Sequence, residues 1–234
     1  APNPIDAVRT EALAALAKAM IKPDAGAPIT EAERADENPA IPAGYTYFGQ
    51  FVDHDITFDP TPLGAAERDT EAMDDFRSPA LDLDSVYGRG PADQPYLYQP
   101  GTDQLRTGPA PGNGAAGVGT RHDLFRLNDG TPILGDKRND ENKIVSQLHG
   151  AIIALHNKVV QQDALLAPFG SVAGDANSRF PAAVRFVRRH YQWVVLHDYL
   201  RRITEPGMVE DVLNNGGVPV LNNYLKQQAE YPYM

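Results

Sequence analysis

One stretch of the sequence constrains the fold more than any other, because it places a histidine between two carboxylates inside an apolar run. Residues 44–59 read GYTYFGQFVDHDITFD, in which His54 is flanked by Asp53 and Asp55. Charged groups cost several kcal/mol to remove from water unless they are paired or bound to a metal. We therefore expect a polar site at this stretch, with partners from elsewhere in the chain.

A helical conformation would point these polar residues in two directions. Gln50 and His54 lie four residues apart, one above the other on one helix face, with Asp53 beside them. Asp55 points about 100° further round. The stretch would thus offer Gln50, His54 and Asp53 to one pocket and Asp55 to a second site behind it. The alternative is a core histidine that is hydrogen-bonded to a neighbouring aspartate.

Composition narrows the class of protein. The 234 residues, 42% of them hydrophobic, are enough for one sizeable domain with its own core. No apolar run approaches the roughly 20 residues that cross a bilayer, so we expect no membrane span. The net charge of −10 argues against a nucleic-acid partner. The chain has no cysteine, which excludes disulfides and thiolate ligation of haem or zinc.

Helical periodicity dominates the pattern of apolar residues. It predicts helices over residues 4–20 and 182–203. A third long helix follows Gly135, capped by Asp136 or Asn139, with its apolar stripe formed by Val145, Leu148, Ile152, Leu155 and Val159. In the helix at 182–203, Pro181 suits the first turn, Val194 is expected on the buried side, and Arg188 is expected largely outside.

The remaining segments predict loops. Residues 28–44 and 65–77 are polar connectors, residues 91–136 carry scattered Gly and Pro, and Gly and Pro residues break the chain after residue 206 into short pieces. No internal repeat or domain boundary is visible. The predicted fold is therefore mainly α-helical, with long irregular loops and little β structure.

A short loop after residue 77 predicts a metal site. Ser78, Asp82 and Asp84 supply oxygen atoms at alternating positions, and Ca²⁺ takes six to eight hard oxygen ligands, including backbone carbonyls. The spacing is not that of an EF-hand. The alternative is a capped turn or a solvated strand edge, which short Asp-x-Asp sequences often form.

Two further pairs of residues stand out near the third helix. Arg138 and Glu141 stand at the start of its apolar stripe, so we expect them to face the interior; the alternative is a surface ion pair worth about 0.3–0.5 kcal/mol. His149 and His156 lie two turns apart on one face. We interpret them as core or pocket-edge histidines rather than metal ligands.

Three segments, in this order, resemble the animal-type haem peroxidases and their bacterial relatives. They are FGQFVDHD at residues 48–55, the segment 78–88 that ends in VYG, and GDKRNDE at 135–141, followed by LH at 148–149 and HN at 156–157. The resemblance implies the haem peroxidase (animal-type) fold, with residues 1–234 as the N-terminal, distal portion of a single peroxidase domain. The iron-ligating histidine would then lie in the proximal portion, beyond Met234.

The resemblance also implies a role for each matching residue. His54 would be the distal histidine, Gln50 its neighbour in the peroxide pocket, and Arg138 the distal arginine. Asp53 and Glu141 match the carboxylates that can form ester bonds to haem b. The calcium ligands would be Asp55, Ser78, the carbonyl of Ala80, Asp82 and Asp84.

The function that the resemblance implies is a peroxidase that reduces hydrogen peroxide and oxidises a halide, pseudohalide or small organic donor. An imidazole such as that of His54 suits proton transfer between the peroxide oxygens, and the guanidinium of Arg138 suits the stabilisation of developing negative charge. Calcium at Asp55 would fix the orientation of His54. Asn142 stands where some members have a methionine that forms a third haem link, so we expect bromide, iodide, thiocyanate or phenols to be used before chloride.

Two alternative functions stay open. One is a haem-dependent fatty-acid oxygenase of the same superfamily, whose tyrosyl radical donor would also lie beyond Met234. The other is a calcium-stabilised binding module without catalysis. The sequence shows no targeting signal, and the affinity range of calcium loops favours an exported protein.

Overall fold

The computed structural model describes residues 11–12, 14–15, 40–59, 75–78, 80–108 and 123–215. The chain divides into two compact units, residues 1–39 and residues 40–234. In the first unit the four described residues are helical, which agrees with the helix predicted over residues 4–20. The predictions for most of 28–44 and 65–77, for 109–122 and for the segment after 215 lie outside the described residues.

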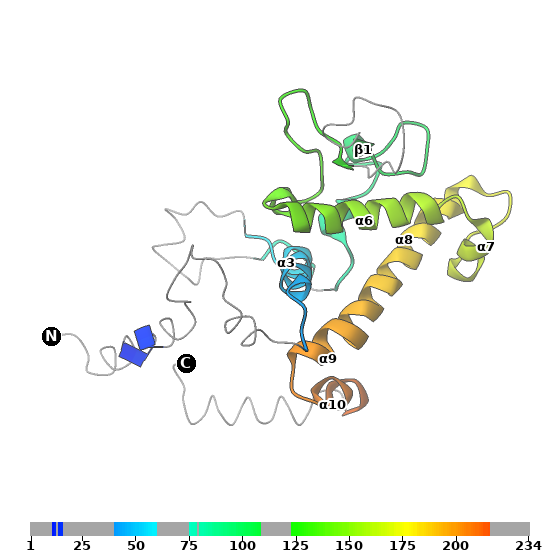
Figure 1. Cartoon of the computed structure of the whole chain (residues 1–234). Helices are drawn as coiled ribbons and strands as arrows, with labels where there is room; N and C mark the ends of the chain where they lie inside the picture. Colours follow the sequence, from blue (N-terminus) through cyan, green and yellow to red (C-terminus); the bar gives the residue numbers. More distant parts are fainter. Residues whose placement is uncertain are drawn as a thin grey trace. The chain divides into compact units, whose positions relative to one another are not determined.

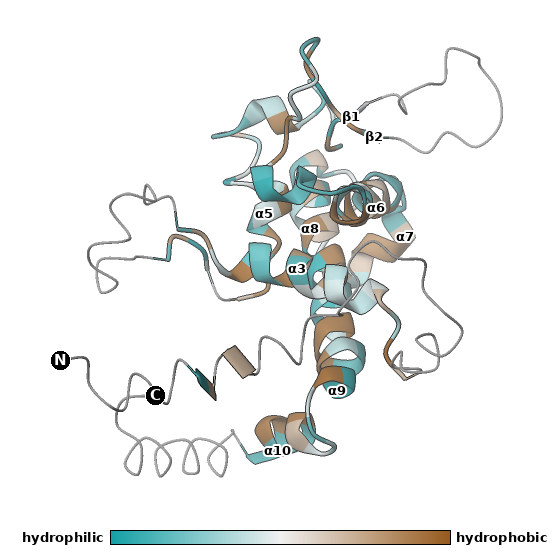
Figure 2. Ribbon diagram, turned by 60° about the vertical axis from the view of Figure 1, so that its left-hand side comes forward, coloured by the Kyte–Doolittle hydropathy of each residue, from teal (hydrophilic) through white to brown (hydrophobic). Residues whose placement is uncertain are grey.

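Three long helices frame the second unit (Figure 1). They are α3 (Gly44–Ile56), α6 (Lys143–Val159) and α8 (Ala176–Val194). Their apolar sides meet in one core that includes Phe51 of α3, Val145 of α6, and Val187 and Tyr191 of α8. Figure 2 shows hydrophobic and hydrophilic residues alternating around these helices, as expected for helices that bury one face.

The other elements are short. The described part of the chain holds little β structure, since its one sheet pairs two antiparallel two-residue strands, β1 and β2, with Thr107 opposite Leu124. The prediction of a mainly helical fold is confirmed. The short elements are α5 (Asp84–Tyr87), η2 (Pro95–Leu97), β1 (Thr107–Gly108), β2 (Asp123–Leu124), η3 (Lys137–Asp140), α7 (Asp163–Leu166), η4 (Ala167–Phe169), the π-helix η5 (Val195–Tyr199), α9 (Leu200–Ile203) and α10 (Met208–Asn215).

The start of helix α8 differs from the prediction. The helix begins at Ala176, because the Asp175 side chain accepts a hydrogen bond from the backbone N–H of Asn177 and caps it more than a turn before Pro181. Pro181 therefore lies inside the helix. Val194 was expected to be buried but is 37% exposed, since the buried face runs through Val187, Tyr191 and Val195 at intervals of four residues.

The cap of helix α6 also differs from the prediction. Asn142 caps it, because its side-chain oxygen accepts hydrogen bonds from the N–H groups of Ile144 and Val145. Asp136 instead caps η3, the short 3₁₀ helix that precedes α6. Asn139 lies within η3 and is fully buried. The intervening 3₁₀ turn thus separates the two predicted capping residues from the long helix.

Two glycines allow close approaches that position α3 and η3. A Cβ atom at Gly49 would lie 2.2 Å from the hydroxyl of Tyr199, so a larger residue there would displace the Tyr199 ring from α3. A Cβ atom at Gly135 would lie 2.5 Å from the carbonyl oxygen of Ser85. This second contact is with backbone and lets the segment before η3 pass directly against α5.

Candidate functional site

Consecutive residues of α3 have different surroundings, as the helical prediction requires. His54 is buried with 4% of its surface exposed, and Asp55 is completely buried. Asp53, one residue earlier, is exposed. The helix therefore presents one carboxylate to solvent and the other to the interior.

Two buried groups hold the ring of His54 from within. Its Nδ1 is hydrogen-bonded to Asn139 Oδ1 at 2.8 Å, and Asn139 Nδ2 is hydrogen-bonded to His149 Nδ1 at 3.0 Å. Asn139 and His149 are both fully buried, and burial lowers the pKa of His149 to about 4, so this histidine is neutral at pH 7. The partner of His54 among the described residues is thus an amide, where the core-histidine alternative expected an aspartate.

Gln50 lies one turn before His54 and joins α3 to the segment after η3. Its Nε2 donates to Glu141 Oε2 at 3.3 Å, and its Oε1 accepts from Asn142 Nδ2 at 3.1 Å. Glu141 is exposed, which corrects the expectation that it faces the interior. Since η3 turns the chain before α6 begins, Glu141 falls at the rim of the site and not on the buried stripe.

Arg138 lies against the C-terminal end of α3. Its Nη2 donates to the backbone carbonyl oxygens of His54, at 3.1 Å, and of Thr57. Carbonyls at a helix C-terminus lack partners within the helix, and a cation stabilises them. The guanidinium of Arg138 therefore meets α3 at the backbone of His54. Its hydrogen bonds to described residues go to Asp136, to Thr57 and to the His54 carbonyl oxygen, and not to the imidazole ring.

A second arginine shares the carboxylate that pairs with Arg138. Asp136 Oδ2 accepts from Arg77 Nη2 at 2.7 Å and from Arg138 Nη2 at 2.8 Å. Burial disfavours the charged form of Asp136, but the hydrogen bonds from the two arginines outweigh it and lower the pKa of this carboxyl group. Both guanidinium groups also lie over the Phe58 ring, at 5.1 and 5.4 Å from its centroid.

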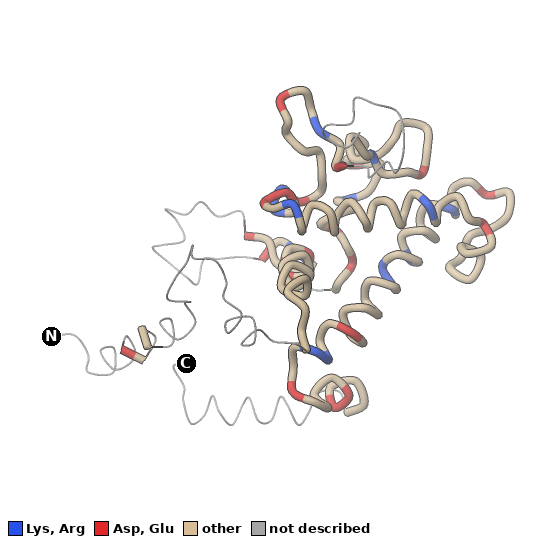
Figure 3. Tube along the Cα trace, in the orientation of Figure 1, with Lys and Arg blue, Asp and Glu red and all other residues tan. Residues whose placement is uncertain are grey.

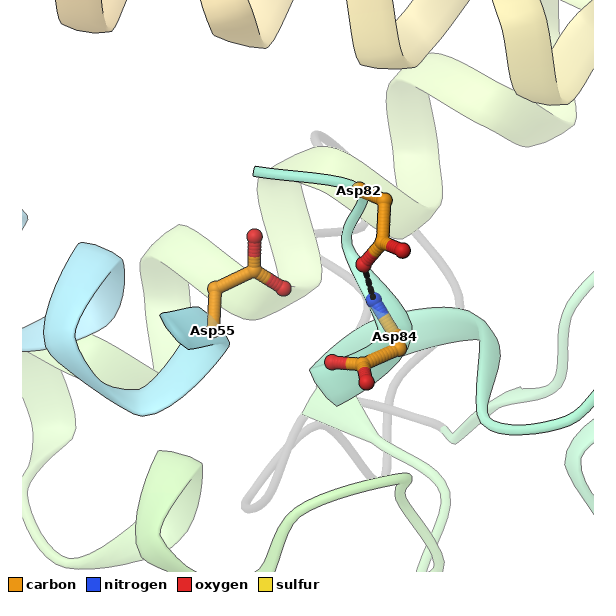
Figure 4. A group of neighbouring side chains, drawn as sticks. All are labelled: Asp55, Asp82 and Asp84. Carbon is orange, nitrogen blue, oxygen red and sulfur yellow. Dashed lines mark hydrogen bonds between the residues drawn. The ribbon is translucent and has the colours of Figure 1, made fainter. Parts of the chain in front are cut away.

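Three carboxylates come together behind His54 (Figure 4). One oxygen each of Asp55, Asp82 and Asp84 lie within 4.8 Å of one another. Asp55 reaches the group from α3, Asp82 from the preceding loop and Asp84 from the start of α5, with Asp82 Oδ1 accepting from the Asp84 N–H. Asp55 accepts from Leu83 N–H and from the Ser85 hydroxyl. The three predicted aspartates are therefore neighbours in space.

The predicted carbonyl and hydroxyl ligands lie beside this group with different contacts. The backbone N–H of Ser78 is close enough to Asp84 to lower the pKa of its carboxyl group. The Ala80 carbonyl accepts from Gln192 Nε2 at 3.2 Å, so one of its lone pairs is already used. The loop that carries these residues has two left-handed leucines, Leu81 and Leu83 with φ of 52° and 60°. Such conformations cost about 1–2 kcal/mol for a residue with a Cβ atom.

Two of the described arginines lie near the three carboxylates: Arg77, which also pairs with Asp136, and Arg188, whose Nε donates to the Asp82 carbonyl. Burial, with a smaller contribution from the nearby Asp84 carboxylate, raises the pKa of Asp55 to about 6. Burial also raises the pKa of Asp84, against the effect of Arg77. Arg77 Nη1 lies 3.3 Å from Asp84 Oδ1, but without hydrogen-bond geometry, and this oxygen has no hydrogen-bond partner among the described residues.

The hydroxyl of Tyr191 is a further polar group at the acidic cluster. The residue is 4% exposed, and its hydroxyl has no hydrogen-bond partner in the described part of the chain. Burial raises the pKa of this hydroxyl, and the neighbouring Asp55 raises it further. Asp55 is thus close enough to affect Tyr191 without forming a hydrogen bond of normal geometry.

Sequence reasoning missed several residues of these sites. Asn139 and Asn142 were considered only as a helix cap and as the replacement for a methionine, yet each bonds a predicted site residue. The signal for Asn139 was its place in RNDEN, directly after Arg138. Arg77 and Tyr191 carried no sequence signal, because their contacts with the acidic cluster exist only once the chain is folded.

Elsewhere in the described part of the second unit, the predicted site residues do not gather at a second place. A cavity of about 230 Å³ lies where α7 and η4 meet the start of α8, away from α3 (Figure 1), and no predicted site residue lines it. Helix α8 carries basic residues and no acidic ones along its length (Figure 3). In the described part of the chain, no helix has the length and hydropathy required to cross a bilayer.

Comparison with known proteins adds no family to this geometry. No protein-family model matches the sequence, and comparisons with curated proteins and with solved structures give no match.

Proposed function

We propose that this protein is a haem-dependent peroxidase that reduces hydrogen peroxide and oxidises a halide, pseudohalide or small organic donor. The observation that carries the proposal is the meeting of two distant segments. Gln50 and His54 of α3 contact Glu141, Arg138 and Asn139, which lie 84 to 91 positions further along the chain. Four of them, Gln50, His54, Arg138 and Glu141, are residue types and positions that the resemblance to the haem peroxidases requires.

The exposed rim of this site has groups that fit a haem. The Asp53 carboxylate accepts no hydrogen bond among the described residues, and Glu141 accepts only from Gln50 there. Both carboxylates could therefore bind haem b by ester bonds, as the resemblance implies. Haem supplies the electron chemistry of peroxide reduction. The iron-ligating histidine is proposed to come from a further polypeptide segment, the proximal portion of the domain.

His54 would carry out the proton transfers. With Nδ1–H held by Asn139, its Nε2 has a lone pair that no described residue engages. That nitrogen can accept a proton from one peroxide oxygen and return it to the other, which is general acid–base catalysis. Gln50, fixed by Glu141 and Asn142, would orient the peroxide beside it.

Arg138 would supply fixed positive charge next to His54. Its pairing with Asp136 keeps the guanidinium beside the end of α3, and one N–H of Nη1 has no partner among the described residues. A preorganised cation of this kind stabilises negative charge that develops on an oxygen.

The acidic cluster fits a calcium ion on its donor chemistry. Asp55, Asp82 and Asp84 provide hard oxygen atoms, with Asp84 Oδ1 and the Tyr191 hydroxyl unbonded beside them. Bound calcium would offset the negative charge of these carboxylates and hold Asp55, thereby fixing the end of α3 that carries His54.

The test is peroxide reduction by the natural full-length protein loaded with haem and calcium, compared with His54→Ala. General acid–base catalysis contributes about 10²–10⁴-fold, so we expect the variant to lose that much turnover. His190→Ala serves as the control, because His190 is exposed on α8 and contacts Phe186 and not α3. Equal turnover in wild type and His54→Ala would refute the proposal.

One observation favours a second function, a calcium-stabilised binding module without catalysis. The guanidinium of Arg138 is largely used by Asp136, Thr57 and the His54 carbonyl, which is a structural arrangement. Calcium binding without haem binding would support this second function. Oxygenation of a fatty acid in place of oxidation of small donors would support the oxygenase of the same superfamily.

A further inference from the structure

An unbranched series of three buried side chains leads from the proposed acid–base group into the core. It runs from His54 through Asn139 to His149, with hydrogen bonds of 2.8 and 3.0 Å. His149 Nε2 is buried and has no hydrogen-bond partner among the described residues, so the series ends there. The edge of Phe51 packs against the His149 ring, with 6.4 Å between the two centroids.

An amide between two imidazoles permits two hydrogen-bonding arrangements. In the first, His54 Nδ1–H donates to Asn139 Oδ1 while Asn139 Nδ2–H donates to His149 Nδ1, which leaves the lone pair of His54 on Nε2. In the second, the amide is turned over and both rings change tautomer, so that His54 Nε2 carries the hydrogen. The orientation of Asn139 therefore couples the tautomers of the two histidines.

We infer that Asn139 is a positioning residue that keeps the hydrogen of His54 on Nδ1, and that His149 fixes the orientation of the Asn139 amide. Only the catalytic consequence rests on the proposed function. A proton taken up at His54 Nε2 leaves the Nδ1–H bond to Asn139 unchanged, so both charge states of the ring fit the same contacts. The turned-over arrangement would not allow this, because its Nε2 has no lone pair.

The environment of His149 supports the assignment. The ring is completely buried on α6, and Asp136 and Asp140 are the charged groups that act on it. Burial outweighs both of them and keeps the ring neutral at pH 7. A neutral ring can accept the Asn139 amide hydrogen at Nδ1, whereas a charged ring would carry hydrogen on both nitrogens and would force the turned-over amide.

The experiment is long-range ¹H–¹⁵N correlation NMR on the full chain labelled with ¹⁵N-histidine, which identifies the protonated nitrogen of each ring. In the wild type at pH above 7 we expect His54 as the Nδ1–H tautomer. Asn139→Leu removes the acceptor and should populate the Nε2–H tautomer. Asn139→Asp keeps an acceptor at the same place and should retain Nδ1–H. His149→Phe should give a mixture, since the amide is then free to turn over.

Asn157→Leu is the matched control. Asn157 lies on α6, the helix that carries His149. Its amide bonds the backbone N–H and carbonyl of Leu105, away from His54. We expect the His54 tautomer to be unchanged in this variant. The wild-type spectrum alone decides the inference if a variant fails to fold, because a hydrogen on His54 Nε2 would overturn it.

Peroxide turnover separates this inference from the proposed function. If the protein is a peroxidase, Asn139→Leu should lower kcat by about 10²-fold or more, within the contribution of general acid–base catalysis, and Asn139→Asp should restore part of it. The expected tautomer without any peroxide turnover would refute the proposed function and leave the inference intact. Peroxide turnover together with a hydrogen on His54 Nε2 would refute the inference and leave the proposed function intact.

Discussion

The two sides of helix α3 handle buried polar groups in opposite ways. On one side, His54 bonds a neutral amide, which bonds a neutral imidazole. On the other side, Asp55 lies next to two more carboxylates, and the nearby Arg77 is shared with Asp136. The first arrangement surrounds His54 with neutral groups, whereas the second gathers three carboxylates. Adjacent residues of one helix can thus enter a series of neutral hydrogen-bonding groups and a group of acidic side chains.

The largest expected effect concerns His149, on the side of α3 where His54 and Asn139 lie. The pKa of His149 is about 4 in the folded protein, below its ordinary value of 6.5, so the unfolded chain binds the proton first as the pH falls. The stability that this group contributes is complete above pH 6.5 and is lost as the pH falls toward 4, by about 3 kcal/mol. Urea unfolding of the wild type and of His149→Phe at pH 7 and pH 4 measures the difference.

As the pH falls from 7 to 4, the free energy of unfolding of the wild type should fall by about 3 kcal/mol more than that of His149→Phe. At pH 7 the variant should be less stable, because the Asn139 amide loses its acceptor. The comparison subtracts the titration of Asp55 and the other carboxyl groups, which both proteins share. Parallel dependence on pH in the two proteins would mean that His149 is not a neutral buried group.

The next effect concerns calcium binding at the acidic cluster of Asp55, Asp82 and Asp84. Calcium at one hundred times its dissociation constant should stabilise the wild type by about 2.7 kcal/mol, seen as a higher Tm, if it binds only the folded state. Asp82→Asn and Asp84→Asn should lose most of this gain. Asp93→Asn should keep it, because Asp93 is an exposed residue paired with Arg89. An equal response in all four proteins would place the calcium elsewhere.

The smallest effect concerns Arg77, which connects the two sides through Asp84 and Asp136. Arg77→Gln removes a positive charge 3.3 Å from Asp84, so calcium should bind more tightly, by about 1 kcal/mol or roughly fivefold at low salt. Arg77→Lys retains the charge and serves as the control. Calcium titration of the three proteins by calorimetry gives the constants. Weaker binding in Arg77→Gln would show that the charge of Arg77 does not oppose calcium binding.

Much of the fold could be predicted from residue spacing. The helix at α3 and the burial of His149 and His156 follow from intervals of three and four residues, which the chain repeats over several turns. The predicted apolar stripe of α6 is buried at Val145 and Val159 and only partly buried at Leu148, Ile152 and Leu155. The boundaries were harder to predict. Asp175 capped α8 before Pro181, and η3 moved the start of α6 to Lys143, because local side-chain hydrogen bonds decide which turn comes first.

Part of the candidate site could also be predicted. Asp55, Asp82 and Asp84 were expected to be neighbours and are, because their loop returns to the end of α3. The resemblance to the haem peroxidases named residues but not their contacts. The contact of Arg138 with the α3 carbonyls, the position of Glu141 at the rim and the bond from Asn139 to His54 could not be read from spacing.

The sequence by itself determined which residues of α3 point together and which point apart, because a helix fixes the angle between neighbours. Only the tertiary structure decided what each of them meets. The separation of 85 positions between His54 and Asn139 is bridged by packing of the whole core, and no local rule predicts which side chain arrives at such a contact. Burial then sets the charge state, since removal from water favours a neutral His149 and opposes the ionisation of Asp55.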